Sequence, residues 1–394
     1  MTLSLKLPNA SGAIEAYTLR GTTPVKPAAG VKFNRIAYSA AHVVADPLAA
    51  IDPWLQCAVD WDATIAYRQR LWSLGLGVAE AMDTAQRGMG LDWPTSLELI
   101  RRSLDAAKDV PGALIASGCG TDHLVLENVK TVDEVIAGYE EQMAAIEKLG
   151  GKLIVMASRA LARVAKSPAD YERVYDRILS QAKQPVVLHW LGDMFDPALK
   201  GYWGNDDADK AMDTALAVIA AHPDKVDGIK ISLLDKDKEI AMRRRLPAGV
   251  RMYTGDDFNY AELIAGDGHG AEITHGQSDA LLGIFDAIAP AAAAALGELA
   301  QGKVQAFHDI LGPTVPLSRH IFAAPTRFYK TGVVFMAWLN GHQRHFSMVG
   351  GQQSTRSLLH FAELFRLADA ANLLEQPELA VHRMKTLAAL HGVE

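Results

Sequence analysis

The run Lys225-Val-Asp-Gly-Ile-Lys-Ile-Ser-Leu-Leu-Asp235 is the most informative stretch of the chain. Its apolar residues predict a short buried strand, and Lys230 stands at the centre of that strand. An ammonium group that is buried without a partner is costly, so such a lysine tends to lose its proton. A neutral amine attacks carbonyl carbons, which is the first step of Schiff-base chemistry. The same pattern also fits a lysine at a strand end that swings out to pair with a carboxylate.

Seven further apolar runs of strand length are spaced through the chain, separated by amphipathic stretches such as 96–107, 132–149, 169–182 and 207–221. With residues 226–231 they give eight predicted strands: 35–39, 78–82, 113–117, 152–157, 185–190, 226–231, 250–254 and 271–275. Short strands that alternate with helices predict a parallel α/β fold. Eight such units in a row predict a (β/α)8 TIM barrel. No G-x-G-x-x-G fingerprint follows the first strand, which disfavours an open dinucleotide-binding sheet.

The two ends of the chain differ from this alternating pattern. Residues 1–30 are polar and interrupted by proline and glycine, and they predict an N-terminal arm. Residues 31–285 hold the predicted barrel, and residues 286–394 are almost entirely helical in pattern. That is more helix than the last barrel unit needs, so the sequence predicts a C-terminal helical extension packed on the barrel.

The composition is that of an ordinary soluble globular protein. Hydrophobic residues make up 49% of the 394 residues and charged residues 22%, and the net charge is −7. The basic residues are scattered, which argues against nucleic acid as a partner. Two cysteines, Cys57 and Cys119, cannot form a disulfide framework and indicate a cytoplasmic protein. No apolar run approaches the length of a membrane span, and the N-terminus does not read as a signal peptide.

In a barrel of this class the active site lies where the strands end at their carboxyl termini. Lys230 is the only lysine among the predicted strand ends, and it needs a nearby proton shuttle. His189 on the neighbouring strand and Thr84 are the candidates for that role. The predicted substrate-binding residues are the other polar side chains at these ends, namely Ser117, Thr121, Arg159, Asp193, Thr254, Asp256 and His275.

Structural roles remain open for several of these residues. Thr84 could cap the turn that follows its strand, and Ser117 could belong to loop chemistry only. His189 could be a core histidine whose hydrogen bonds are satisfied. Asp256 and the adjacent Asp257 could cap the next helix, and at least one of them is expected to do so.

Several of these segments, taken in order, resemble those of the dihydrodipicolinate synthase/N-acetylneuraminate lyase family of Schiff-base barrel aldolases. Residues 75–87 resemble the family segment that ends in G-T-T-G-E, with Thr84 on the first threonine. Residues 184–190 resemble L-P-V-x-L-Y-N, and Asp227-Gly-Ile-Lys230 resembles x-G-I-K-D, whose lysine forms the imine. Residues 325–332 are similar to the late N-P-x-x-x-K segment. The order and spacing carry more weight than any single motif.

The chain also departs from the family pattern, which indicates a divergent, DUF993-like branch. The relay tyrosine of the family is His189 here, and Gln86 and Arg87 stand where the family has glycine and glutamate. The arginine that commonly binds the carboxylate of the oxo acid has no match in residues 191–199. The resemblance therefore implies that Lys230 forms an imine, but with a substrate other than pyruvate.

The first functional hypothesis is a class I lyase or aldolase that acts on a keto acid or keto-sugar-like substrate through an imine on Lys230. The hypothesis requires no cofactor, and the resemblance implies a homodimer or homotetramer. The second hypothesis is a metal-dependent barrel enzyme, in which a divalent ion binds side chains near the strand ends, with His42, Glu80, His189 and His275 as candidate ligands. A third hypothesis is a barrel that binds a small molecule without turning it over.

Overall fold

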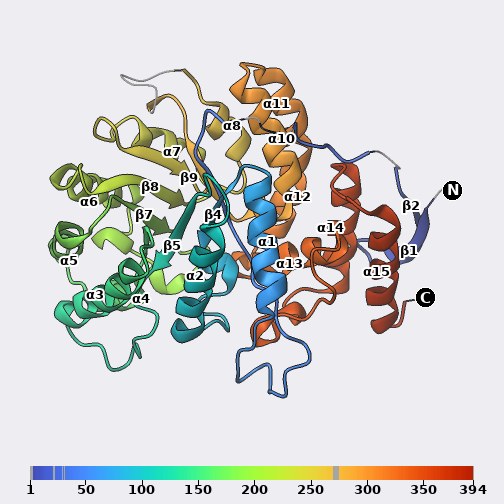
Figure 1. Ribbon diagram of the computed structural model, residues 1–394, viewed down its shortest axis with the longest axis horizontal. Helices are drawn as coiled ribbons and strands as arrows, with labels where there is room; N and C mark the ends of the chain where they lie inside the picture. The colour runs from blue at the N-terminus through green and yellow to red at the C-terminus, as the bar shows by residue number, and fades with distance from the viewer. Residues whose placement is uncertain (1–2, 21–22, 29, 31, 269–274, 394) are drawn as a thin grey trace.

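The computed structural model describes residues 3–20, 23–28, 30, 32–268 and 275–393. Figure 1 shows a barrel in the half of the molecule built from the middle of the chain, with the C-terminal helices gathered on one side of it. The strands are β1 (Ser4–Pro8), β2 (Ile14–Thr18), β3 (Ala37–Ala40), β4 (Gly77–Glu80), β5 (Ile115–Cys119), β6 (Leu153–Met156), β7 (Val186–Leu191), β8 (Val226–Ser232), β9 (Arg251–Thr254) and β10 (Asp279–Leu282).

The barrel closes in the order β10-β3-β4-β5-β6-β7-β8-β9, and every neighbouring pair is parallel. The helices between the strands are α1 (Trp61–Ser73), α2 (Trp93–Ala107), α3 (Val132–Lys148), α4 (Arg159–Val164), α5 (Pro168–Gln181), α6 (Ala208–Ala221), α7 (Lys236–Arg243) and α8 (Tyr260–Ala265). The predicted (β/α)8 barrel with a C-terminal helical extension is therefore confirmed.

The eighth barrel strand is not where the sequence predicted it. The predicted strand at 271–275 falls mainly on residues 271–274, which lie outside the described part of the chain. The strand that closes the barrel is β10 at Asp279–Leu282, between β9 and β3. Residues 271–275 and 279–282 are both short runs that mix apolar and polar residues and follow polar or glycine residues, so the sequence pattern does not separate them.

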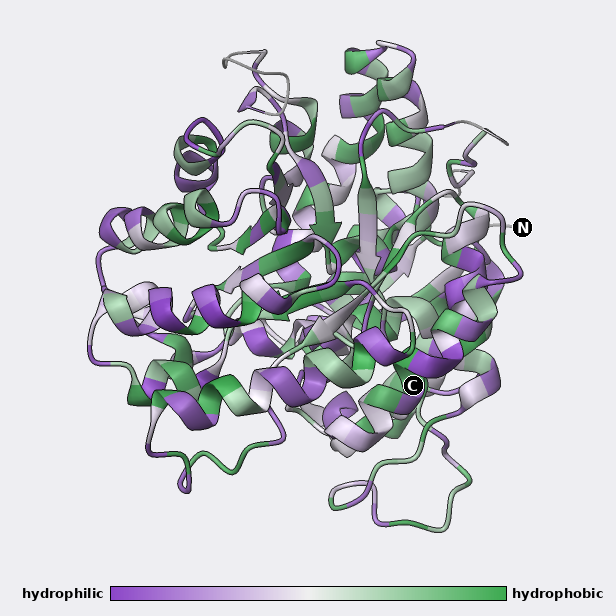
Figure 2. Cartoon of the chain, turned by 60° about the vertical axis from the view of Figure 1, so that its left-hand side comes forward, coloured by the Kyte–Doolittle hydropathy of each residue, from purple (hydrophilic) through white to green (hydrophobic). Residues whose placement is uncertain are grey.

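Side chains inside the barrel form a small core of their own. The inward positions hold Tyr38, Ala40, Ala79, Met82, Ala116, Ile154, Met156, Val187, Tyr253 and Leu281. The alternate positions of the same strands pack outward against the helices. Figure 2 shows the corresponding hydropathy, with largely hydrophobic strands and helices that carry one hydrophobic and one hydrophilic side. Alternation along each strand therefore fixes which side chains face the interior.

The C-terminal region adds a helical layer to the barrel. Its helices are α9 (Ile284–Ala287), α10 (Ala289–Ala300), α11 (Val304–Leu311), α12 (Val315–Ile321), α13 (Tyr329–Leu339), α14 (Leu358–Ala370) and α15 (Pro377–Leu390). All eleven residues of α13 are buried. The N-terminal β1–β2 hairpin packs against α14 and α15, so the arm and the C-terminus lie side by side (Figure 1). None of the described helices is long and apolar enough to cross a membrane.

Candidate functional site

Lys230 points into the barrel. It lies on β8 two residues after Gly228, and its register partners are His189 on β7 and Tyr253 on β9. Tyr253 belongs to the inner core, whereas Ile229 and Ile231 pack outward against the helices. The Lys230 residue is 7% exposed. The alternative of a strand-end lysine that swings out to the helical side is therefore excluded.

Glycine leaves room for the lysine side chain. A Cβ placed on Gly255, directly after β9, would lie 2.7 Å from Lys230 Cε and 2.6 Å from the carbonyl oxygen of Ile231. Real Cβ atoms do not approach other atoms so closely. Any residue larger than glycine at position 255 would therefore collide with the aliphatic part of the Lys230 side chain. The Thr254-Gly255-Asp256-Asp257 turn thus borders the stem of Lys230.

Two carboxylates influence the charge of Lys230. Burial lowers the pKa of the Lys230 amine, and the charges of Asp257 and Asp83 raise it in part. Burial raises the pKa of Asp257 to about 7, and Lys230 opposes that shift. Asp257 Oδ1 also accepts a hydrogen bond of 2.9 Å from the backbone N–H of Ile284. The site therefore contains an amine and a carboxyl group whose pKa values are both shifted toward neutrality.

His189 lies beside Lys230 on the same inner face, because neighbouring in-register strands are only about 4.8 Å apart. Burial, and then the charge of Lys230, lower the pKa of His189 well below its usual value. Its Nε2 lies 3.3 Å from Ser232 Oγ, and its Nδ1 has no hydrogen-bond partner. The ring is thus neutral at physiological pH, with one nitrogen free to exchange a proton with a ligand.

Thr84 follows β4 in the 3₁₀ turn Asp83–Ala85, and it contacts the C-terminal region. Its Oγ1 lies 2.8 Å from Tyr329 Oη at the start of α13, and either group can donate the hydrogen bond. A Cβ on Gly283, at the end of β10, would lie 3.1 Å from the Tyr329 ring and 3.4 Å from Thr84 Oγ1. Burial keeps the pKa of Tyr329 well above its usual value, so the phenol stays protonated. Tyr329 and Thr84 form a hydroxyl pair at the barrel mouth.

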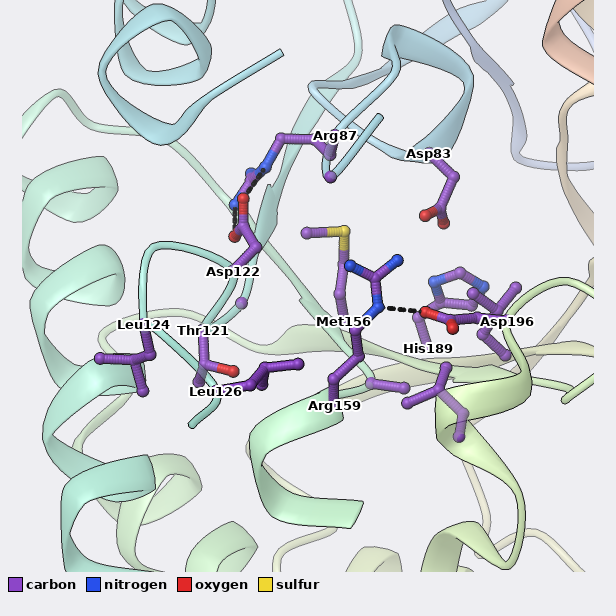
Figure 3. A pocket seen from close by; sticks show the side chains of 15 residues that line it. Asp83, Arg87, Thr121, Asp122, Leu124, Leu126, Met156, Arg159, His189 and Asp196 are labelled. Carbon is purple, nitrogen blue, oxygen red and sulfur yellow. Dashed lines mark hydrogen bonds and ion pairs between the residues drawn. The ribbon is translucent and has the colours of Figure 1, made fainter. Parts of the chain in front are cut away.

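A cleft opens above these residues in two connected parts. We call the part lined by Thr121, Asp122, Met156 and His189 the inner cleft, with about 620 Å³ of space (Figure 3). We call the part lined by Trp54, Arg327, Lys330 and Thr355 the outer cleft, with about 1030 Å³. Both parts are lined by Asp83, Arg87, Gly88, Arg159, Leu191 and Asp196, so they adjoin one another. Lys230 does not line either part and lies next to His189 on the adjoining strand.

Of the predicted substrate-binding residues, Thr121 and Arg159 line the cleft. Thr121 Oγ1 lies 2.6 Å from Ser158 Oγ. Arg159 forms an ion pair with Asp196, and in Figure 3 its guanidinium and the Asp83 carboxylate point toward one another across the inner cleft. Arg87 also lines the cleft and forms an ion pair with Asp122.

The structure does not bring the other five predicted binding residues to the cleft. Ser117 pairs in register with Leu153, and Thr254 with Ile231, so both face the helices. Asp193 is exposed in the loop after β7. The remaining two residues, Asp256 and His275, also lie away from the cleft lining.

Asp256 closes its own turn. Its Oδ1 accepts hydrogen bonds from the backbone N–H groups of Phe258 and Asn259 at 2.8 and 3.0 Å. The expectation that Asp256 or Asp257 caps the next helix is wrong, because Asn259 is the N-cap of α8 and Asp256 closes the turn before it. Asp257 is the aspartate whose charge acts on Lys230. His275 lies four residues before β10, at the amino-terminal end of the barrel, because the predicted strand that would have ended at His275 is not the closing strand.

The four candidate metal ligands of the second hypothesis are engaged separately. His42 Nδ1 lies 2.8 Å from Asp286 Oδ2, in a pair that is fully buried. Glu80 forms a fully buried ion pair of 2.8 Å with Arg68. His189 faces Ser232, and His275 lies at the far end of the barrel. Across the described residues, no three His, Cys, Asp or Glu side chains are grouped so that they could hold a metal ion.

Sequence reasoning missed Asp83, Asp257, Tyr329 and Lys330 as site residues. Asp83 adjoins Thr84, and Asp257 adjoins Asp256, so each missed carboxylate lies next to a residue that the sequence singled out. Tyr329 and Lys330 lie in the 325–332 segment, whose resemblance to a family motif was the available signal. Their contact with the barrel mouth depends on how the C-terminal helices pack, which local sequence does not reveal.

Comparison with known proteins bears on the fold and the family. Residues 5–393 match the family described as "Protein of unknown function (DUF993)". No curated protein matches the sequence.

Solved structures of dihydrodipicolinate synthases share the architecture. The Aquifex aeolicus enzyme superimposes with a TM-score of 0.64 at 12% identity, covering 87% of this chain and 99% of that one. The Oceanobacillus iheyensis enzyme gives 0.62 at 15% identity, covering 86% and 97%. YagE from E. coli K12, a dihydrodipicolinic acid synthase family protein solved with pyruvate, gives 0.61 at 13% identity, covering 92% and 99%. The chain belongs to the DUF993 family, and its barrel has the fold of the dihydrodipicolinate synthases.

Proposed function

We propose that this protein is a class I lyase or aldolase that acts on a keto acid or a keto-sugar-like substrate through an imine on Lys230. The observation that carries the proposal is the buried, inward-facing Lys230 with the neutral His189 beside it. Burial favours the neutral amine, which is the nucleophilic form. The shared fold with the dihydrodipicolinate synthases supports the same chemistry.

In the proposed reaction the Lys230 amine adds to the substrate ketone, and loss of water gives an iminium ion. The iminium accepts the electron pair of the breaking C–C bond, which leaves an enamine on Lys230 and releases an aldehyde. Protonation of the enamine and addition of water then release the ketone product and restore the amine. No cofactor is required, because the iminium is itself the electron sink.

His189 is the proposed general acid and base of these steps. Its pKa is low, so the ring is neutral and can accept a proton. The proton comes from the substrate hydroxyl group on the carbon atom that becomes the aldehyde when the C–C bond breaks. The Thr84–Tyr329 pair supplies two linked hydroxyl groups that can pass a proton at the mouth. Asp257 stabilises the protonated amine and the iminium through its charge.

Reduction with sodium borohydride tests the proposal, because borohydride converts an imine to a stable secondary amine. The protein is incubated with pyruvate, hydroxypyruvate or dihydroxyacetone, then reduced, digested and mapped by mass spectrometry. The expected result is an adduct on Lys230 that is absent from Lys230→Ala and present in Lys236→Ala, which removes an exposed lysine nearby. Turnover of a ketone substrate that leaves Lys230 unmodified under reduction would rule the imine out.

A further inference from the structure

Two cations at the start of α13 line the outer cleft without a carboxylate partner. Lys330 is 5% exposed, and its Nζ donates to the carbonyl oxygen of Arg327 at 3.0 Å and contacts Met89 Sδ at 3.4 Å. Arg327 is exposed, and its guanidinium lies 5.0 Å from the Phe328 ring. Throughout the described chain, no salt bridge joins either side chain to an acidic residue. Both charges are therefore available to a ligand.

Stability does not explain these two charges. A helix N-terminus carries a partial positive charge, so cations there are unfavourable and acidic residues are favoured. The first turn of α13 nevertheless contains no acidic residue, and Arg327 and Lys330 stand on either side of its start. Burial of the Lys330 amine adds a further cost and lowers its pKa to about 8. Positions that cost folding energy in this way are typical of ligand sites.

Four charged groups surround the Lys330 amine: Asp83, Arg159, Asp196 and Arg327. Arg159 and Asp196 form an ion pair with one another. The charge of Asp83 acts on both lysines, since it raises the pKa of Lys330 and also that of Lys230. The cluster therefore has an excess of positive charge at its outer end, away from the proposed reaction centre.

We propose that the outer cleft binds the phosphate group of a phosphorylated keto substrate, with Lys330 and Arg327 as its ligands. The inference rests on the proposed function, and it names the substrate class for that site. An ammonium group and an arginine fork together match the several acceptor oxygens and the double charge of a phosphate monoester. The inner and outer parts of the cleft adjoin and share six lining residues, so the proposed substrate lies along both parts.

Binding of inorganic phosphate tests the site without any assumption about the substrate. Isothermal titration of the full chain is expected to give saturable binding of phosphate and weaker binding of acetate at equal ionic strength. Lys330→Met is expected to weaken phosphate binding about 30-fold or more, because it removes a buried charge partner. Arg327→Met removes an exposed charge and is expected to weaken binding a few-fold. Lys303→Met, at a surface lysine paired with Glu298, is the control and retains wild-type affinity.

The pH dependence gives a second readout. Phosphate remains a dianion above pH 8, whereas Lys330 loses its proton as the pH rises through about 8. Affinity is therefore expected to fall between pH 7 and pH 9 in the wild type and to change less in Lys330→Met. Folding of each variant is checked by its thermal unfolding midpoint.

Absence of saturable phosphate binding would overturn the inference, as would equal binding by the wild type and Lys330→Met. Acetate that binds as tightly as phosphate would also overturn it. Borohydride reduction of the wild type with ketones that carry no phosphate is the separate arm for the proposed function. Turnover of a ketone that leaves Lys230 unmodified under reduction removes the imine and the substrate assignment that rests on it, whereas failure of phosphate binding alone leaves the imine standing.

Discussion

At the residue scale, the chemistry depends on how burial changes the protonation of two neighbouring side chains. Lys230 and His189 are register partners inside the barrel, and burial favours the neutral form of each. The lysine then acts as a nucleophile, and the histidine accepts a proton. Neither residue makes an ion pair with a described carboxylate, so the interior leaves both groups available.

Replacement of His189 separates imine formation from bond cleavage. His189→Gln is expected to lower kcat about 10²–10⁴-fold, the usual contribution of a general acid or base, while borohydride still labels Lys230. His222→Gln is the control, because His222 pairs with Asp176 far from the cleft. Wild-type kcat in His189→Gln would remove the histidine from the mechanism.

The rate of imine trapping is expected to rise with pH. Because burial lowers the pKa of Lys230, the neutral amine appears at a lower pH than for an exposed lysine. Asp257 raises that pKa in part, so Asp257→Asn should move the midpoint of the trapping profile to lower pH. An unchanged midpoint, or a shift to higher pH, would contradict the assigned contact.

At the element scale, the C-terminal helices complete the barrel mouth. Helix α13 brings Tyr329 to Thr84 and Lys330 to the outer cleft. Sequence reasoning found the helical region and the motif at 325–332, but it could not tell which barrel loop the helix would contact. Side-chain contacts between distant segments depend on packing, which the local pattern does not encode.

Removal of the Tyr329 hydroxyl tests that contact. Tyr329→Phe is expected to lower kcat by about 10²-fold and the free energy of unfolding by about 1 kcal/mol. Tyr139→Phe is a matched control, because the buried Tyr139 hydroxyl donates a 2.6 Å hydrogen bond to the carbonyl oxygen of Met156. The control should lose similar stability and keep kcat, and equal kcat losses in both variants would indicate a structural role only.

The ion pair between Arg68 on α1 and Glu80 on β4 holds a helix to the barrel. Both side chains are fully buried, and Glu80 also accepts a hydrogen bond from Ser103 on α2. Arg68→Met leaves the Glu80 carboxylate without its charge partner and is expected to cost about 3–5 kcal/mol in urea unfolding. Arg101→Met breaks an exposed ion pair and should change stability by no more than about 1 kcal/mol. Similar losses in both variants would contradict this role.

At the scale of the whole molecule, the alternation of strands and helices was enough to predict the barrel. Seven of the predicted strands overlap observed barrel strands, since each is a short apolar run between amphipathic helices. The eighth failed because two similar runs follow β9.

Among site residues, alternation along a strand could have placed Ser117 and Thr254 on the outer face, because each neighbours an inward-facing residue. The choice between Asp256 and Asp257 depends on the turn itself, which the sequence does not specify. The predicted homodimer or homotetramer stays a prediction, which light scattering can check.

The most direct measurement is a crystal structure of the protein after incubation with a keto substrate and reduction by borohydride. The account predicts electron density that is continuous from Lys230 Nζ to the former carbonyl carbon, with His189 in contact with the bound molecule. Density for the ligand elsewhere in the cleft, with a free Lys230 amine in a protein that turns that ligand over, would contradict it.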